Sequence, residues 1–211
     1  MARRLNYEDL ITILYVFNKM KNGGGNMKIA KLLYLFEDVL YNKSIIGSNY
    51  IFKKYPMGPY DNKIGRNLQN LSINGFLKMK PRYFEKIDNF SNVYFENYYT
   101  TKFLKKIDDL IQENSRVFNE LDKIMSGFGD LRGEQLKDYL YSLNQTGLKK
   151  QKILEYSKFE VILDPKYLTT PAYKFYLDED WYDTIEIMLN PDILSGLQKG
   201  VKDAQLGNFN Y

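Results

Sequence analysis

The chain has 211 residues, of which 44% are hydrophobic, 27% charged and 16% aromatic, and its formal net charge is +4. This composition fits one globular domain, or one domain with a short appended segment, and excludes a disordered chain. No apolar run reaches the roughly 20 residues of a membrane-spanning helix. The chain contains no cysteine and no histidine, which excludes disulfides, thiolate or imidazole metal sites and Ser-His-Asp catalysis. We therefore expect a cytoplasmic binding protein without a signal peptide, a cofactor or a bound metal, rather than an enzyme.

Residues 7–21 and 27–42 are predicted to form the first two helices. In the first, Leu10, Ile11 and Leu14 recur near helical spacing. The run 23–25 is all glycine, and we expect it to be a flexible turn that ends this helix. The second helix carries a wide apolar face, which is typical of a helix in the centre of a small core.

Residues 44–59 are predicted to be irregular or extended, and a third helix is expected over 60–72, ending at Asn74-Gly75. Residues 76–84 and 93–100 are rich in aromatic and β-branched residues, which indicates a β-hairpin at 76–100. Helices followed by a hairpin are the order of a winged-helix unit, with 60–72 in the position of the recognition helix and the hairpin as the wing.

Further helices are predicted at 101–125, 132–145 and 147–158, and residues 159–177 are predicted to be an extended or irregular connector. The fold class we expect is mainly α (α+β). A helical, winged-helix-like domain would cover residues 1–158, and a separate helical segment would cover residues 178–211.

That last segment is predicted to contain two short amphipathic helices. The break falls at Asn190-Pro191, where Asn190 is a good N-cap and Pro191 suits a first helical position, and Gly207 is placed to end the second helix. Apolar residues recur at helical spacing in both helices: Trp181, Ile185, Met188, Leu189, Ile193, Leu197 and Val201. These faces would dock either on the protein's own body or in the groove of a partner.

Charge is divided unevenly along the chain. Residues 1–100 hold 15 Lys and Arg against 8 Asp and Glu, a net +7, whereas residues 101–211 hold 15 against 18, a net −3. This division indicates two partners of opposite charge, or drift of composition on a solvated surface. Basic side chains near the third helix and the hairpin are candidates for contacts with DNA phosphates, or are ordinary surface charges: Lys53, Lys54, Lys63, Arg66, Lys78, Lys80 and Arg82.

No set of residues suggests catalysis. The glycines at 23–25 are not followed by Lys-Ser or Lys-Thr, so they do not form a phosphate-binding loop. The acidic run Asp178-Glu179-Asp180, with Asp183, stands where a helix N-terminus favours negative charge. These carboxylates are therefore expected to stabilise a helix, not to hold a metal.

The run from residue 27 to residue 76 resembles the Panacea domain of SocA-like antitoxins. The matching steps are Lys31-Leu32-Leu33-Tyr34, Ile46-Gly47-Ser48-Asn49-Tyr50, Gly58-Pro59-Tyr60-Asp61 and Gly75-Phe76. The threonine-histidine step near the end of that domain is missing, since the chain has no histidine.

Residues 179–207 are similar to the toxin-wrapping tails of antitoxins that neutralise RelE/ParE-type or Doc-type toxins. The match centres on Met188-Leu189-Asn190-Pro191-Asp192, followed by Leu197 and Gly200.

Together the two resemblances imply an antitoxin that neutralises its cognate toxin by direct binding and also binds its own promoter. The tail's apolar residues would lie in a toxin groove, with Asp180 and Asp183 facing a basic surface, and a homodimer is a further association that the resemblance implies. The alternative is a winged-helix transcriptional regulator without a toxin partner.

Overall fold

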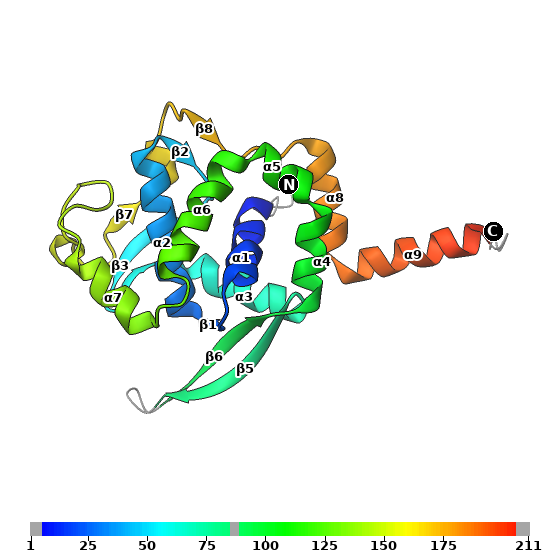
Figure 1. Ribbon diagram of the computed structural model, residues 1–211, viewed down its shortest axis with the longest axis horizontal. Helices are drawn as coiled ribbons and strands as arrows, with labels where there is room; N and C mark the ends of the chain where they lie inside the picture. Colours follow the sequence, from blue (N-terminus) through cyan, green and yellow to red (C-terminus); the bar gives the residue numbers. More distant parts are fainter. Residues whose placement is uncertain (1–5, 85–88, 206–211) are drawn as a thin grey trace. The chain divides into compact units, whose positions relative to one another are not determined.

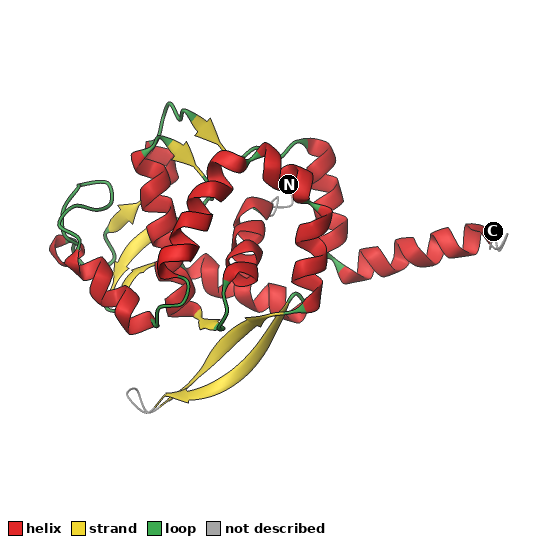
Figure 2. Cartoon of the chain, viewed as in Figure 1, coloured by secondary structure: helices red, strands yellow, loops and turns green. Residues whose placement is uncertain are grey.

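A computed structural model describes residues 6–84 and 89–205 of the chain. By its internal packing the chain divides into two compact units, residues 1–176 and residues 177–211. Helices dominate, and the strands form small sheets (Figures 1 and 2). Gly207 and the tip of the predicted hairpin, residues 85–88, lie outside the described residues.

The helices of the first unit are α1 (Tyr7–Lys19), α2 (Asn26–Asn42), α3 (Asn62–Ile73), α4 (Tyr98–Lys106), α5 (Asp108–Glu113), α6 (Ser115–Phe128) and α7 (Gly133–Ser142). Of these, α1 and α2 are the most deeply buried. On α2 almost every residue from Ile29 to Leu40 is buried, because α3, α6 and α7 pack against it (Figure 1). The wide apolar face predicted for this segment therefore does mark the centre of the core.

Three small sheets flank the helices. The first has the order β1-β6-β5, from β1 (Gly24–Gly25), β6 (Asn89–Glu96) and β5 (Leu77–Phe84). The second pairs β2 (Ile45–Ile46) with β8 (Tyr173–Lys174) in parallel. The third has the order β4-β3-β7, from β4 (Gly58–Tyr60), β3 (Phe52–Tyr55) and β7 (Val161–Leu163).

The glycine run after α1 is a strand, not the flexible turn that its composition predicted. Gly24 and Gly25 pair with Tyr94 and Val93 of β6. A Cβ on Gly23 would stand 2.4 Å from the carbonyl oxygen of Tyr94, so only glycine lets the two backbones approach this closely. The run thus attaches the β5–β6 hairpin to the first two helices.

Two other predictions for this unit were wrong. The helix expected over 101–125 is broken at Ile107 and Asn114, where the buried amide of Asn114 donates to the Leu110 carbonyl and accepts from the backbone N–H of Tyr176, 62 residues away. The segment 147–158 contains only a short 3-10 helix, η2 (Ile153–Glu155). The predicted connector carries β7 and β8, which pair with β3 and β2 and so belong to the first unit.

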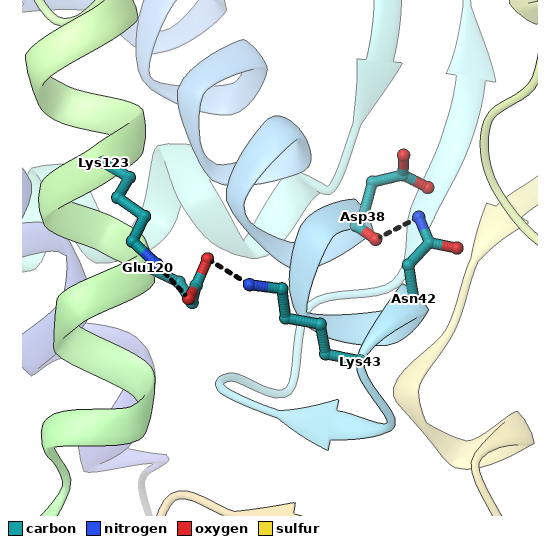
Figure 3. A network of polar contacts seen from close by, with 5 residues as sticks. All are labelled: Asp38, Asn42, Lys43, Glu120 and Lys123. Atoms are coloured by element: carbon teal, nitrogen blue, oxygen red, sulfur yellow. Dashed lines mark hydrogen bonds and ion pairs between the residues drawn. The ribbon is translucent and has the colours of Figure 1, made fainter.

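Ion pairs join the end of α2 to α6 (Figure 3). The carboxylate of Glu120 accepts from the ammonium groups of Lys43 and Lys123, each at 2.7 Å. The side-chain amide of Asn42, the last residue of α2, donates to the carbonyl of Asp38 one turn earlier, at 2.8 Å.

The second unit contains α8 (Glu179–Leu189) and α9 (Pro191–Gln205), with the break where the sequence predicted it. The carboxylate of Asp178 caps α8 by accepting from the N–H of Trp181 at 2.8 Å. The side-chain oxygen of Asn190 accepts from the N–H groups of Asp192 and Ile193 and so begins α9. None of the helices in the described residues has the length and apolar composition needed to cross a membrane.

Candidate binding surfaces

The β5–β6 hairpin separates its side chains by charge. Side chains alternate between the two faces of a strand, so Lys78, Lys80 and Arg82 share one face of β5. All three are exposed, and the register sets Lys78 opposite Phe95 of β6. Lys80 Nζ lies 5.9 Å from the centre of the Phe95 ring. One face of a projecting hairpin (Figure 1) therefore presents a row of cations beside an aromatic ring.

Helix α3 comes directly before this hairpin and packs against β5. Its apolar side is buried through Ile64, Leu68 and Leu71. Its exposed side includes Arg66, predicted from the sequence, and two side chains that the sequence analysis missed, Gln69 and Asn70. Their exposure follows from helical spacing relative to the buried residues, which is the signal that could have identified them.

The structure does not bring the seven predicted cations together. Lys63 lies on α3, but its ammonium donates to the Asn49 carbonyl at 2.9 Å and so holds a neighbouring segment. Lys53 and Lys54 lie on β3, in a different sheet from the hairpin. Lys54 Nζ donates to Tyr141 Oη of α7 at 3.0 Å. Of the seven cations, the candidates for phosphate contacts on the adjoining elements α3 and β5 are therefore Arg66 of α3 and the three cations of β5.

Residues 47–51, which include part of the Panacea-like motif, are held by side chains from α1 and from the start of α3. From α1, the carboxylate of Asp9 accepts from the Asn49 N–H at 2.7 Å. At the start of α3, the carboxylate of Asp61 accepts from the Lys63 N–H at 2.8 Å. It also accepts from the Ile51 N–H at 2.7 Å. Asp61 is therefore the N-cap of α3, and it also holds the preceding loop against the start of that helix.

The other motif residues lie in the same buried region or close to it. Tyr50 is fully buried, and its hydroxyl donates to the Asp9 carbonyl and accepts from the Asn67 amide. Gly47 allows the loop to lie against α2, because a Cβ there would stand 2.3 Å from Leu40 Cδ1.

Gly58 has a φ of 109°, which glycine adopts without strain in the β3–β4 turn. Pro59 is buried, and Tyr60 packs edge-on against Tyr55 with 5.6 Å between ring centres.

A second buried network holds residues 146–147 to α2. The carboxylate of Asp38 accepts from Thr146 Oγ1 at 3.0 Å and from the Gly147 N–H at 2.8 Å. Tyr34 Oη lies 2.6 Å from Thr146 Oγ1, within a hydrogen bond. These contacts join residues more than 100 positions apart, and they give Tyr34, a motif residue, a role in packing.

Three charged groups in this interior have perturbed acidity. Burial raises the pKa of Glu37 to about 8, against the opposing effect of hydrogen bonds from Ser48 and Gly47. Burial also raises the pKa of Asp9 to about 6, although the Asn49 N–H and the Lys63 charge act in the other direction. For the motif residue Lys31, burial and then the charge of Lys137 lower the pKa to about 8.

In the second unit, the predicted partner-binding residues fall into two groups. Ile185 and Leu189 of α8 are buried, and Trp181 and Met188 are partly exposed. On α9, Ile193, Leu197 and Val201 are 40%, 49% and 57% exposed and follow one another at i, i+4 and i+8. Asp180 and Asp183 of α8 are exposed. The available apolar surface is therefore the stripe on α9.

Comparison of the chain with models of known protein families gives no match, and comparison with curated proteins gives none either. Among the described residues, no group of three or more Asp and Glu side chains is arranged to hold a metal ion. The features that remain to be explained are the basic hairpin, the exposed face of α3 and the apolar stripe on α9.

Proposed function

We propose that the protein is an antitoxin that neutralises a cognate toxin by direct binding through its C-terminal unit. The observation that carries this proposal is the apolar stripe of Ile193, Leu197 and Val201, which is exposed on a helix of 15 residues. An amphipathic helix with an unburied apolar face is the form in which many partners are captured in a groove. The similarity of residues 179–207 to toxin-wrapping tails supports the same function.

The energetics of this binding follow from the stripe and from the acidic residues before it. Burying the exposed parts of three aliphatic side chains contributes about 2–4 kcal/mol before ordering costs. Asp180 and Asp183 would favour a basic partner, mainly by speeding encounter and by selecting among partners.

The test is a growth assay in cells that express each reading frame flanking this gene, one at a time, as the candidate toxin. Wild-type protein is expected to restore growth, and a variant with Ile193→Gln, Leu197→Gln and Val201→Gln is expected not to. Glutamine is nearly as good a helix former as leucine, so α9 should persist. Ser195→Gln with Lys199→Gln, two exposed positions on the same helix, is the matched control. Full protection by the apolar-stripe variant would show that the stripe on α9 is not the surface that binds the toxin.

A second candidate function, DNA binding, is favoured by the chain order of the first unit. Helices α1, α2 and α3 are followed by the β5–β6 hairpin, and β1, between α1 and α2, completes the sheet β1-β6-β5. This order supports a winged-helix arrangement in which residues 43–61 are an insertion between the second and third helices. Arg66, with Lys78, Lys80 and Arg82, would then contact duplex phosphates.

Duplex binding is tested with a labelled fragment from upstream of the gene, titrated at several salt concentrations. Lys78→Gln with Lys80→Gln is expected to weaken binding and to reduce the slope of log affinity against log salt by about 1.8, the effect of two phosphate contacts. The control is Lys105→Gln with Lys106→Gln, two exposed lysines on α4. An unchanged slope in the hairpin variant would assign duplex binding, if any, to another surface.

A further inference from the structure

Lys31 of α2 is a buried lysine whose ammonium group has no carboxylate partner among the described residues. The residue is only 2% exposed. Its Nζ donates to the Met27 carbonyl, one turn earlier on the same helix, at 3.2 Å. An ammonium group that leaves water loses solvation that one carbonyl contact does not restore, and lysines are therefore rarely buried without an anion beside them.

Helix α7 packs against α2, and the two helices run in the same direction. Near their starts, a Cβ on Gly133 of α7 would lie 3.9 Å from the Lys28 Cβ of α2. Beyond the end of α7, the Gly147 N–H donates to Asp38, near the end of α2. Residues in the middle of α7 therefore lie beside residues in the middle of α2.

This arrangement sets Lys137 of α7 beside Lys31, because each lysine is about one turn after the point where the helices first meet. The two charges act on each other: burial and then the Lys137 charge lower the pKa of Lys31, and no acid opposes this effect. None of the ion pairs found in the described residues includes either lysine. The fold thus holds two neighbouring cations without a counter-charge.

Tyr141 adds a hydroxyl group and a third cation to this pair. It follows Lys137 by one turn of α7, and Lys137 Nζ lies 5.7 Å from the centre of its ring. From β3, Lys54 Nζ donates to Tyr141 Oη at 3.0 Å. A phenol oxygen that accepts a hydrogen bond can still donate its own proton. Lys54, Lys137 and Tyr141 are all partly exposed, so a ligand can reach them from solvent, whereas Lys31 lies behind them.

We propose that Lys54, Lys137 and the Tyr141 hydroxyl bind a phosphate group, either free or on a small molecule, with the charge of Lys31 behind them. A phosphate dianion offers several acceptor oxygens in different directions, which suits separate ammonium and hydroxyl donors. A planar carboxylate is better matched by the forked guanidinium of arginine, and none of these residues is arginine. The inference is independent of the antitoxin function, and it concerns a different sheet from the basic hairpin.

The test is isothermal titration calorimetry on the full chain at constant ionic strength, with inorganic phosphate and AMP as separate probes. Lys137→Gln is expected to weaken binding about tenfold or more, because it removes a charged donor. Lys31→Met is expected to weaken it about fivefold, because only a charge behind the site is lost. Lys105→Gln, an exposed lysine on α4, is the control and should change affinity by less than about twofold. Tighter binding of AMP would identify a phosphate on an organic molecule, and tighter binding of inorganic phosphate would identify the free ion.

Three results would overturn the proposal: no binding of either probe at about 10 mM, unchanged affinity in the Lys137→Gln protein, or equal binding of acetate. Thermal melting gives an independent readout. In chloride buffer Lys31→Met should melt no lower than wild type, because an apolar chain of similar length replaces an unpaired buried charge. Phosphate should raise the melting temperature of wild type more than that of this variant. A Lys31→Met protein that melts well below wild type would show that the ammonium group is already satisfied within the fold, which also overturns the proposal.

Discussion

The loop segments around α2 and the helix α9 differ in the kinds of side chain that they bury and expose. Around α2, charged groups are buried, and Asp9, Asp38 and Asp61 each accept backbone N–H groups from a loop. On α9, apolar groups are exposed and make a continuous stripe. A buried carboxylate is tolerated only when its oxygens accept hydrogen bonds. A large exposed apolar surface, in contrast, is typical of a site that another molecule covers. The contacts of the first region thus fix the structure, and under the proposed function the stripe of the second region receives a partner.

The strongest test of the first region is Asp38→Ala. It leaves the Gly147 N–H and the Thr146 hydroxyl buried without their acceptor, which is expected to lower the free energy of unfolding by about 3–5 kcal/mol. Urea unfolding measures the loss. Asp138→Ala, an exposed acid on α7, should cost less than about 0.5 kcal/mol. Equal losses in the two variants would show that the buried network does not hold the loop.

A smaller effect is expected from Gly47→Ala. The added Cβ would stand 2.3 Å from Leu40 Cδ1 and 3.1 Å from Glu37 Oε1, so these buried side chains, the loop or α2 must shift. Overpacking of this kind costs about 1–3 kcal/mol. Gly127→Ala serves as the control, because nothing lies within 4 Å of the position its Cβ would take. A Gly47→Ala protein as stable as wild type would mean that the loop does not need this close approach.

The buried acids also predict how stability changes with pH. The pKa of Glu37 is raised to about 8 and that of Asp9 to about 6, above their values in an unfolded chain. The folded state then holds protons that the unfolded state releases, so the stabilising contribution of these groups is complete below about pH 4 and is lost as pH rises. For Glu37 alone the loss is about 1.4 kcal/mol per pH unit between its unfolded and folded pKa values.

This dependence is measured by calorimetry between pH 5 and pH 8, where the melting temperature of wild-type protein should fall. Glu37→Gln should flatten most of that decline, and Glu134→Gln, an exposed acid on α7, should not. A wild-type melting temperature that rises toward pH 8 would contradict the assignment of Glu37 as a buried, protonated acid.

The parts of the fold that depend on local pattern could be predicted from the sequence. The apolar spacing of α1 and α2, the hairpin and the Asn190-Pro191 break all follow from neighbours in the chain. The β4-β3-β7 sheet could not be predicted, because β7 joins β3 across about 100 residues, and nothing local marks the pairing. The run of glycines was misinterpreted for the same reason, since the strand that it approaches, β6, is some 70 residues later.

The binding surfaces show the same limit. The cations of β5 share a face because of strand alternation, which is visible in the sequence. Lys53 and Lys54 are close to the third helix in sequence but lie on a strand of another sheet, beside α7.

The smallest expected effect on stability is that of substitutions in α9. It distinguishes the exposed stripe of α9 most clearly from the buried network around α2. Because Ile193, Leu197 and Val201 are about half exposed, replacing all three with glutamine should change the free energy of unfolding by less than about 1 kcal/mol, while neutralisation of the toxin is lost. Urea unfolding of the purified protein and the growth assay give the two readouts. If instead the triple variant unfolds several kcal/mol more easily, the stripe completes the protein's own structure, and its exposed fraction is not a surface kept for a partner.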